Sequence, residues 1–546
     1  MHPSPCTREH EGEPGPTSMP PKASTSAAAR CEPPPSPFDT LPDALLGEIL
    51  LHVQYEARRR LALVCKRWRQ LVDSPPLLRR VAVELEAITR DNEREASPAS
   101  DDSASFGGFG WGHDDPERPV QHILGFCWWL KQRAAPHLEQ LAVNLGSLVC
   151  WDEYDNSDLV VSELCGALRT CTRLQVLALS LQCSFQLHAC MDLAPSAQAQ
   201  LRSLSVICMS WDPDVDASLE VADLAALTAL ERLHLAGLPL VLGRSLGVWG
   251  GAQQPAPAQP GDDAVLPPSL TSLTLDGYVD FRSSVQQFVP PQITSLTALQ
   301  HVALGNVQCS SGADFRHLSA LSSLTALRLL RCAHLPTCLP QLQQLRALRL
   351  NDSPRGIEAG LPSAQPELCS VLQQLAAAAA AGQQLTHLVL EGVRQQLPAE
   401  VAALPRLQAL YWVSGHGPSQ LPASGPYLTS LRRLALASRV AASNTGVLSA
   451  MPRVETLAVL GPASRQPKDI AAELSILRWA AQQQPPSLRR LAVSFNDKGL
   501  GPAQLSWPWS SYGLWLQAEL PRLRLPPWLS IELSYANNLL HELRNV

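Results

Sequence analysis

Residues of the types that carry out catalysis occur in this sequence, but not in the arrangements that catalysis requires. Gly243, Ser245 and Gly247 fit the Gly-x-Ser-x-Gly pattern that presents a nucleophilic serine in some hydrolases. That pattern works on a turn between a strand and a helix, which holds the serine in a strained conformation. Here a loop rich in proline and glycine follows the motif, so we interpret Ser245 as a chance match.

The other candidate sites for bound groups also lack their structural context. The glycine cluster Gly107–Gly112 is not placed between a strand and a helix, as a phosphate-binding loop is. Cys165 with Cys171, and Cys332 with Cys338, are spaced too widely for a zinc site and have no histidine partners at matching intervals. The sequence therefore predicts no catalytic residues, no metal site and no cofactor, and we expect a protein that is not an enzyme.

Composition restricts the classes of partner. The chain has 546 residues, of which 43 are basic and 49 acidic, giving a formal net charge of −6. This balance argues against binding to nucleic acid or to a membrane surface. The N-terminus has no apolar core of a secretory signal, and no run approaches the roughly 18 apolar residues of a membrane span. Many of the 14 cysteines lie in apolar periodic segments, so we expect a reducing compartment, cytoplasmic or nuclear.

The segment Leu41–Val83 has the most specific pattern in the chain. Thr40 and Asp43 form a Thr-x-x-Asp capping box, which predicts a helix start with Pro42 in its first turn. Apolar residues then recur at spacings of three and four, which predicts two or three short helices. We expect Pro75 and the proline after it to end the last helix, because neither can donate a helical hydrogen bond.

This segment resembles an F-box, the small helical module that docks onto a Skp-type adaptor of cullin ubiquitin ligases. Leu41 and Pro42 match the family's opening Leu-Pro pair, and Val64, Cys65 and Trp68 match its Val-Cys-x-x-Trp signature. The resemblance implies two partners, the adaptor and through it a cullin. A unit this small also needs its apolar faces covered from outside. The adaptor-binding residues that the resemblance implies are Leu41, Pro42, Leu45, Ile49, Leu50, Val53, Leu61, Val64, Cys65 and Trp68.

The sequence departs from the F-box pattern between the first two predicted helices. The family often has an acidic-Pro-x-Asp-Leu-Leu linker there, whereas this chain has Gln54–Arg59. Arg58 and Arg59 stand at positions that are usually apolar. The start of the second helix and the strength of adaptor binding are therefore left open by the resemblance.

The rest of the chain repeats one six-residue pattern, Leu-x-x-Leu-x-Leu. It begins at the F-box exit, Leu78–Val83, and then recurs 13 times between residues 138 and 493. The copies that start between residues 299 and 345, and between 385 and 454, are 21 to 25 residues apart. This period is that of leucine-rich repeats, which the chain resembles. The last two apolar residues of each copy would face inward from a short strand and be buried by stacking on the next copy. The strand is usually followed by an Asn or Cys that stabilises the turn, but only Cys332 occupies that position, so irregular convex segments are expected.

These patterns predict an α/β fold in which a small helical F-box precedes an irregular leucine-rich-repeat solenoid, or horseshoe. We expect a disordered proline-rich tail at 1–37, the F-box at 38–77, the solenoid at 78–505 and a C-terminal capping segment at 506–546. A flexible insertion is predicted at 91–119, and a convex-side helix at 367–381.

Recognition of a target protein would take place on the concave face of such a solenoid. Outward strand positions there are mostly Ala, Ser or Thr, which predicts a shallow floor. Larger polar and aromatic side chains gather in the middle of the array, and arginine and aromatic residues dominate interface energies. Together they would suit an acidic or phosphorylated partner. The predicted target-binding residues are Arg232, His234, His301, Arg328, Arg349, His387 and Tyr411.

Three functions are compatible with these features. The first is the substrate-recognition subunit of a Skp/cullin/F-box-type ubiquitin ligase, in which the F-box docks the adaptor and the repeats bind a target. The second is a leucine-rich-repeat interaction scaffold that acts outside any ligase, and the altered linker at Arg58 and Arg59 keeps it open. A repeat-type GTPase activator has no supporting catalytic residue and ranks last.

Overall fold

The computed structural model describes most of the chain between residues 38 and 535. The described residues are 38, 41–53, 55–84, 117–145, 155–181, 193–208, 219–220, 224–238, 240–241, 266–277, 289–307, 311–332, 334–351, 365–380, 382–392, 397–413, 419–461, 467–495, 523 and 525–535. The predicted tail at 1–37, the glycine cluster, the Ser245 motif and most of the predicted insertion at 91–119 lie outside them. Residues 117–119 belong to a helix, so the insertion ends earlier than predicted.

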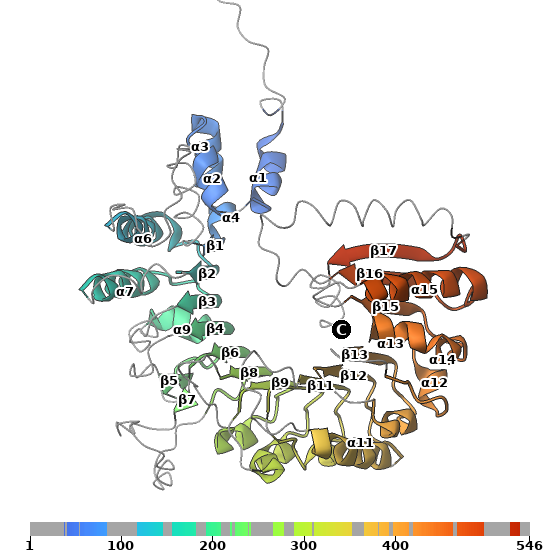
Figure 1. Cartoon of the computed structure of the whole chain (residues 1–546). Helices are drawn as coiled ribbons and strands as arrows, with labels where there is room; N and C mark the ends of the chain where they lie inside the picture. The colour runs from blue at the N-terminus through green and yellow to red at the C-terminus, as the bar shows by residue number, and fades with distance from the viewer. Residues whose placement is uncertain are drawn as a thin grey trace, which may run out of the picture.

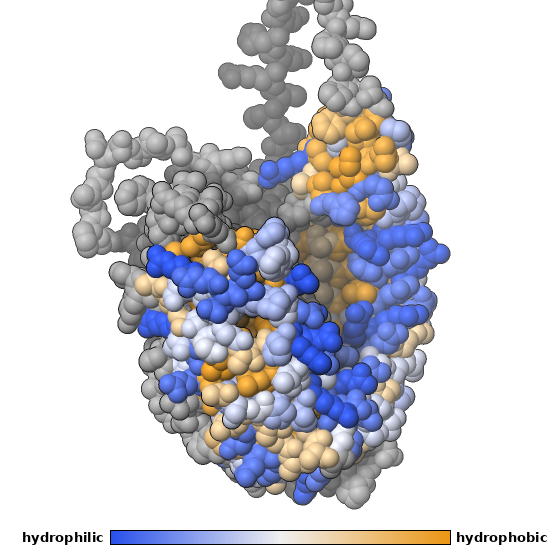
Figure 2. All heavy atoms as spheres, turned by 90° about the vertical axis from the view of Figure 1, so that its right-hand side faces the viewer, coloured by the Kyte–Doolittle hydropathy of each residue, from blue (hydrophilic) through white to orange (hydrophobic). Residues whose placement is uncertain are grey.

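The N-terminal unit is helical, as predicted. It consists of α1 (Asp43–Leu51), α2 (Tyr55–Leu61), α3 (Lys66–Val72) and α4 (Pro75–Leu78). Leu50, Val72 and Leu77 form its core, against which Leu61 and Trp68 pack from the side. The unit lies at one tip of the molecule (Figure 1), and apolar side chains are exposed over it (Figure 2).

The helix ends differ from the prediction on both sides of this unit. Pro42 precedes α1 as its N-cap residue instead of lying in the first turn, and it makes no side-chain capping bond; Thr40 lies outside the described residues. The third helix ends at Val72, before the proline pair. Pro75 instead begins α4, because a missing N–H costs little in the first turn of a helix.

Fifteen strands form one parallel sheet that curves into an open horseshoe, with helices on its outer side (Figure 1). In sheet order they are β1 (Arg80–Glu84), β2 (Gln140–Asn144), β3 (Val176–Leu181), β4 (Ser203–Cys208), β6 (Arg232–Ala236), β8 (Ser272–Asp276), β9 (His301–Gly305), β10 (Ala326–Leu330), β11 (Ala347–Asn351), β12 (His387–Glu391), β13 (Ala409–Val413), β14 (Arg433–Ala437), β15 (Thr456–Leu460), β16 (Arg490–Phe495) and β17 (Ser530–Tyr535). A separate pair, β5 (Leu219–Glu220) and β7 (Leu240–Val241), lies outside this sheet.

The predicted leucine pattern sets the register of the sheet. Leu327 and Leu329 of β10 align with Leu348 and Leu350 of β11, and all four are buried in one continuous core. The residues between them point to the other face, because successive side chains of a strand alternate. The predicted solenoid fold is therefore confirmed.

The convex side is irregular, as the missing Asn/Cys positions predicted. Helices of up to 17 residues alternate on this side with short 3-10 turns and single helical turns. The convex elements are α6 (Glu117–Trp129), a π-helical turn η1 (Leu130–Ala134), α7 (Asp155–Leu168), α9 (Pro195–Gln200), η3 (Pro291–Ser295), η4 (Gly312–Ala320), η5 (Leu339–Gln341), α11 (Gln365–Ala380), η6 (Ala399–Ala403), α12 (Tyr427–Ser430), α13 (Ser438–Ser443), α14 (Thr445–Ser449) and α15 (Pro467–Gln483). The helix predicted at 367–381 corresponds to α11.

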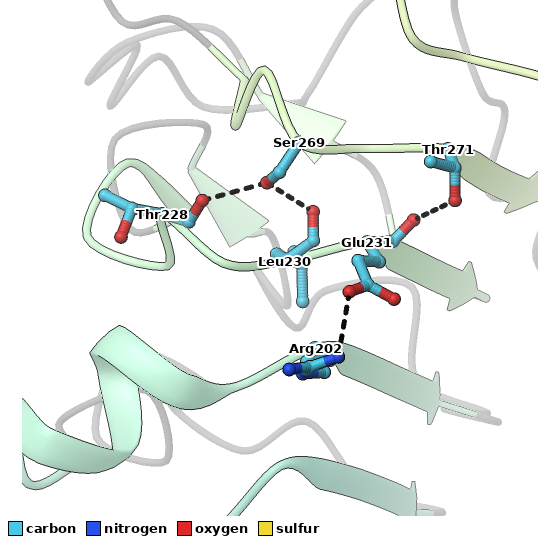
Figure 3. Close-up of polar contacts among 6 residues, drawn as sticks. All are labelled: Arg202, Thr228, Leu230, Glu231, Ser269 and Thr271. Carbon is cyan, nitrogen blue, oxygen red and sulfur yellow. Dashed lines mark hydrogen bonds and ion pairs between the residues drawn. The ribbon is translucent and has the colours of Figure 1, made fainter.

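A different ladder ties neighbouring repeats together at the entrance to the strands. The hydroxyl of Thr271 donates to the carbonyl of Glu231 in the preceding repeat at 3.1 Å (Figure 3), and Thr325 and Thr386 donate equivalently to Gln300 and Arg346. Each of these residues stands directly after the first leucine of the pattern. Threonine at that position therefore supplies bonds between repeats that are lacking after most strands.

Charged residues occupy the same position in several of the repeats that lack threonine there. Arg202 pairs with Glu231 at 3.4 Å (Figure 3), and Arg432 pairs with Glu455 at 3.5 Å. Both pairs are exposed, so each contributes at most about 1 kcal/mol. They align neighbouring repeats more than they stabilise them.

The repeat array is longer than predicted. Ile531 and Leu533 of β17 pair with Leu491 and Val493 of β16, so residues 530–535 form a further repeat strand within the segment predicted as a cap. Its pattern begins with Trp528 in place of leucine, which explains why leucine spacing missed it. The rest of the predicted cap lies mostly outside the described residues.

Gly425 is the position where the convex side depends most on glycine. Its φ is +134°, and an added Cβ would lie 2.5 Å from the carbonyl oxygen of Ala402.

We predict that Gly425→Ala lowers the free energy of unfolding in urea by about 1–3 kcal/mol, because it combines an unfavourable φ with a backbone clash. Gly446→Ala is the matched control: it lies in α14 with nothing within 4 Å of the added atom, so stability should be unchanged or slightly higher. Equal effects of the two changes would contradict this account.

Candidate functional site

The F-box unit exposes an unusual amount of apolar surface. Six of the nine large apolar side chains exposed among the described residues belong to it, so this end of the molecule differs from the rest. They are Phe38, Leu45, Ile49, Leu51, Leu63 and Val64. Figure 2 shows apolar side chains gathered at the top of the molecule, over these helices. A clustered apolar surface of this kind is typical of an interaction site.

The ten predicted adaptor residues divide into a surface set and a core set. Pro42, Leu45, Ile49, Val64 and Cys65 are exposed, whereas Leu41, Val53, Leu61 and Trp68 are half-buried and Leu50 is buried. Leu50 belongs to the core of the F-box itself, so its side chain is not presented to a partner. Phe38, Leu51 and Leu63 are exposed apolar residues that the sequence motif did not identify.

Arg58 explains the departure from the family pattern. It is only 7% exposed, its Nε donates to the carbonyl of Val53 at 2.8 Å, and its Nη1 donates to the carbonyl of Leu77 at 3.1 Å. The guanidinium therefore joins the end of α1 to α4. Arg59, in contrast, is exposed. Arg58 therefore stabilises the inside of the F-box, and its charge is not presented on the surface of the unit.

A second arginine holds the start of the unit. Arg67 pairs with Asp43 at 2.7 Å and donates to the carbonyls of Phe38 and Leu41. The segment before α1 is thereby fixed against α3. The ring of Phe38 also packs edge to face on the ring of Trp68, with 5.9 Å between the two ring centroids. These contacts fix the position of Phe38 within the F-box itself.

Arg58→Ala should destabilise the F-box, because it leaves two buried carbonyl groups without their donor. We expect a loss of about 2–3 kcal/mol in the free energy of unfolding of this unit, measured in the full chain by hydrogen exchange of the backbone amides of α1 to α4 as urea is added. Arg59→Ala removes an equal charge from an exposed position and should change stability by less than about 0.5 kcal/mol. If the two variants have the same free energy of unfolding, the hydrogen bonds of Arg58 do not stabilise the F-box.

The register brings the predicted target-binding residues onto one face of the sheet. His301 and His387 align in the row nearest the start of the strands, which also contains Arg232. Arg328 aligns with Arg349 in the row two residues further on, and this row also contains His234 and Tyr411. All seven therefore lie on the concave side of the strands, opposite the buried leucines.

Arg349 is neutralised by a residue that the sequence did not single out. Its Nη2 lies 2.8 Å from both carboxylate oxygens of Glu391, and the amide of Asn351 donates to the same carboxylate at 2.8 Å. The two charged side chains are 11% and 10% exposed. Glu391 is the last residue of β12, beyond the leucine pattern, and only the pairing of β11 with β12 places it beside Arg349.

The half-buried histidines His234 and His387 add no positive charge at neutral pH, because their pKa values are lowered. Burial lowers the pKa of His234, with nearby Asp276 opposing this shift and Arg328 adding to it; its Nδ1 lies 3.0 Å from the hydroxyl of Ser205. Burial and, to a lesser extent, Arg433 lower the pKa of His387.

The surface that could carry charge recognition is consequently smaller than predicted. Tyr411 is only 3% exposed and forms part of the floor. Arg232, His301 and Arg328 remain exposed among the predicted residues. Arg433 of β14 is also exposed on the same face and was not predicted, because its neighbours Ala409 and Thr456 place it outside the cluster seen in sequence.

No three His, Cys, Asp or Glu side chains among the described residues gather in a way that could hold a metal ion. None of the helices described has the length and apolar character needed to cross a bilayer. Cys165, Cys171, Cys332 and Cys338 are buried and form no disulfide bonds.

The lowered pKa of His234 predicts how stability depends on pH. Because its folded pKa lies below the unfolded value of about 6.5, the unfolded chain binds protons first, and stability falls as pH drops below that value. His234→Gln should therefore reduce the loss of urea resistance between pH 7 and pH 5. His52→Gln, at an exposed site on the F-box, provides the control, and an identical pH profile for the His234 variant and the wild type would refute the prediction.

Comparisons with known proteins agree with the helical unit. Residues 38–80 match the model of the F-box domain. No curated protein sequence matches this chain significantly.

Similar solved structures include an internalin from Listeria monocytogenes, with 13% identity over 57% of this chain and 81% of that one, at a TM-score of 0.26. Internalin C2 from the same organism is 17% identical, covering 38% of this chain and 80% of that one, at a TM-score of 0.22. Such low TM-scores add nothing to the strand register, which defines the fold by itself. The chain therefore carries an F-box domain at residues 38–80, followed directly by a leucine-rich-repeat solenoid.

Proposed function

We propose that this protein is the substrate-recognition subunit of a Skp/cullin/F-box-type ubiquitin ligase. The observation that carries the proposal is the F-box match at residues 38–80 together with the exposed apolar surface of that unit. The adaptor would cover Leu45, Ile49 and Val64, which otherwise remain in water at 53%, 46% and 68% exposure. The cullin would be reached only through the adaptor.

The join between the two parts supports a receptor that holds its target in a defined position. In α4, Leu77 is buried in the F-box core, whereas Leu78 is buried in the core of the solenoid. Strand β1 begins two residues later, at Arg80. No flexible linker separates the units, so a target on the concave face would be held at a nearly fixed distance from the adaptor.

The concave face would bind the target. Arg232, Arg328 and Arg433 are its exposed guanidinium groups, and they favour a partner that presents carboxylates or phosphates. Ubiquitin transfer would be carried out by other subunits, and this chain would act without an active site of its own, in the cytoplasm or nucleus.

The adaptor contact can be tested without disturbing the F-box core. Replacing both Ile49 and Val64 by Asp should weaken binding of a Skp-type adaptor by about a hundredfold or more, because exposed apolar anchors typically contribute 2 kcal/mol or more each. Titration calorimetry with the purified adaptor would measure the change. Trp68 is less suitable because it packs against the F-box core, and its loss would unfold the unit.

Leu159→Asp is the matched control for this experiment. It introduces the same charge at an apolar residue of α7 that is 46% exposed, outside the F-box, and should leave adaptor binding unchanged. Wild-type protein that fails to bind the adaptor, or a double variant that binds it normally, would reject the ligase assignment and favour a repeat scaffold acting outside any ligase.

A further inference from the structure

Lysine is scarce in this chain, although positive charge is not. Only five of the 43 basic residues are lysines, and all the others are arginines. The lysines are Lys22, Lys66, Lys131, Lys468 and Lys498. The long stretch between Lys131 and Lys468, which carries strands β2 to β15, contains none. Most of the solenoid therefore offers no side-chain amine.

The choice between lysine and arginine decides which surface groups can react. A lysine amine, with an ordinary pKa of about 10.4, has a small unprotonated fraction at neutral pH, and that form attacks carbonyl carbon. The guanidinium of arginine stays protonated and has no free electron pair to offer. Arg232, Arg328 and Arg433 on the concave face can therefore bind the acidic groups of a target without accepting an acyl group themselves.

Lys66 and Lys131 are the lysines whose side chains the structure describes, and they differ in environment. Lys131 is half-buried, and its Nζ lies 2.6 Å from the carboxylate of Glu163. Lys66 is exposed, and its side chain has no hydrogen bond or ion pair with any described residue. Lys66 is consequently the one exposed lysine amine among the described side chains.

Lys66 lies beside the surface assigned to the adaptor. It begins α3 directly after Cys65 and two residues after Val64, both of which are exposed. The Cα atoms of Val64 and Lys66 are at most about 7 Å apart, since two residues of chain span no more than that. A standard interface buries about 800 Å² on each partner, which corresponds to a disc of roughly 16 Å radius. An adaptor seated on Val64 would therefore also cover Lys66.

We propose that Lys66 is an acylation site that is open only while the F-box is free of its adaptor. This inference rests on the proposed function and adds a means of regulation to the adaptor surface. The donor is an acyl thioester, carrying either ubiquitin or an acetyl group. The unprotonated amine of Lys66 attacks the thioester carbonyl, a C–N bond forms as the C–S bond breaks, and the proton passes to the departing sulfur.

Acylation of Lys66 and binding of the adaptor exclude each other, because both occupy the same surface. In the assembled ligase Lys66 is covered, so the remaining described surface presents only the ion-paired Lys131 to ubiquitin intended for the target. In the adaptor-free chain Lys66 is exposed, and its acylation keeps the F-box from entering a ligase.

Labelling of the full chain with fluorescein succinimidyl ester, which acylates amines, tests whether the adaptor covers Lys66. Mass spectrometry of the peptides that contain Lys66 and Lys131 gives the rate at each site. In the free chain Lys66 should label about fivefold faster than Lys131, whose amine must first leave its ion pair. Purified Skp-type adaptor at about 100 times its dissociation constant should slow Lys66 by at least about tenfold, because only the free chain reacts, and should leave Lys131 unaffected.

Labelling before binding tests the same exclusion in the opposite direction. By reciprocity, the labelled chain should bind the adaptor at least about tenfold more weakly than the unlabelled chain, as measured by titration calorimetry. Lys66→Arg keeps the positive charge but cannot be acylated, so labelling should change the affinity of this variant by less than about twofold. Lys131→Arg is the matched control, and labelling should weaken its binding as it does in the wild type.

The source of the acyl group is identified by producing the full chain in eukaryotic cells with and without excess adaptor. After digestion with trypsin, ubiquitin leaves a diglycine remnant on Lys66, whereas acetylation leaves an acetyl group. The modified fraction of Lys66 should be at least about tenfold higher without added adaptor.

Four results would overturn the inference and leave the proposed function intact. They are labelling of Lys66 no faster than that of Lys131 in the free chain, unchanged labelling of Lys66 in the adaptor complex, normal adaptor binding by the labelled chain, and an unmodified Lys66 in both cell samples. An unlabelled chain that does not bind the adaptor would reject the proposed function and this inference together, and the calorimetry distinguishes that case from the other four.

Discussion

Every strand of this solenoid buries its inward side chains only because another strand stands beside it in register. Leu327 and Leu329 are covered by the aligned leucines of β11 and by the convex turns, and no single repeat could cover them alone. The ends of such an array are its weak points. At the N-terminal end α4 supplies the cover, with Leu77 turned into the F-box core and Leu78 into the solenoid core. The F-box is therefore both a docking module and the first cap of the repeats.

The concave face follows a different physical rule, because its polar groups are only partly in water. Desolvation keeps His234 and His387 neutral, and Glu391 cancels the charge of Arg349. The exposed positive charge of the concave face is consequently carried by a few arginines, Arg232, Arg328 and Arg433. The small side chains between them form the shallow floor that the sequence predicted.

Sequence motifs were most reliable where one residue type has one structural role. The Val-Cys-x-x-Trp signature located the F-box, and the Leu-x-x-Leu-x-Leu pattern located fourteen of the fifteen strands of the sheet. The strand that was missed, β17, has Trp528 in place of the first leucine, although it pairs in register with β16 as the other repeat strands pair with their neighbours. Proline was interpreted too simply, since Pro75 begins a helix instead of ending one.

The sequence by itself determined which side chains face inward, where the repeats begin and that a helical docking module precedes them, because these depend on periodicity along the chain. Only the tertiary structure decided which polar residues are available. Arg58 donates hydrogen bonds to the carbonyls of Leu77 in α4 and of Val53 after α1, and so it holds the F-box helices together. The positive charge of Arg349 is compensated by an ion pair with Glu391, 42 residues away in the sequence. Contacts of this kind depend on how neighbouring repeats align in space, and residue spacing within one repeat carries no information about its neighbour's side chains.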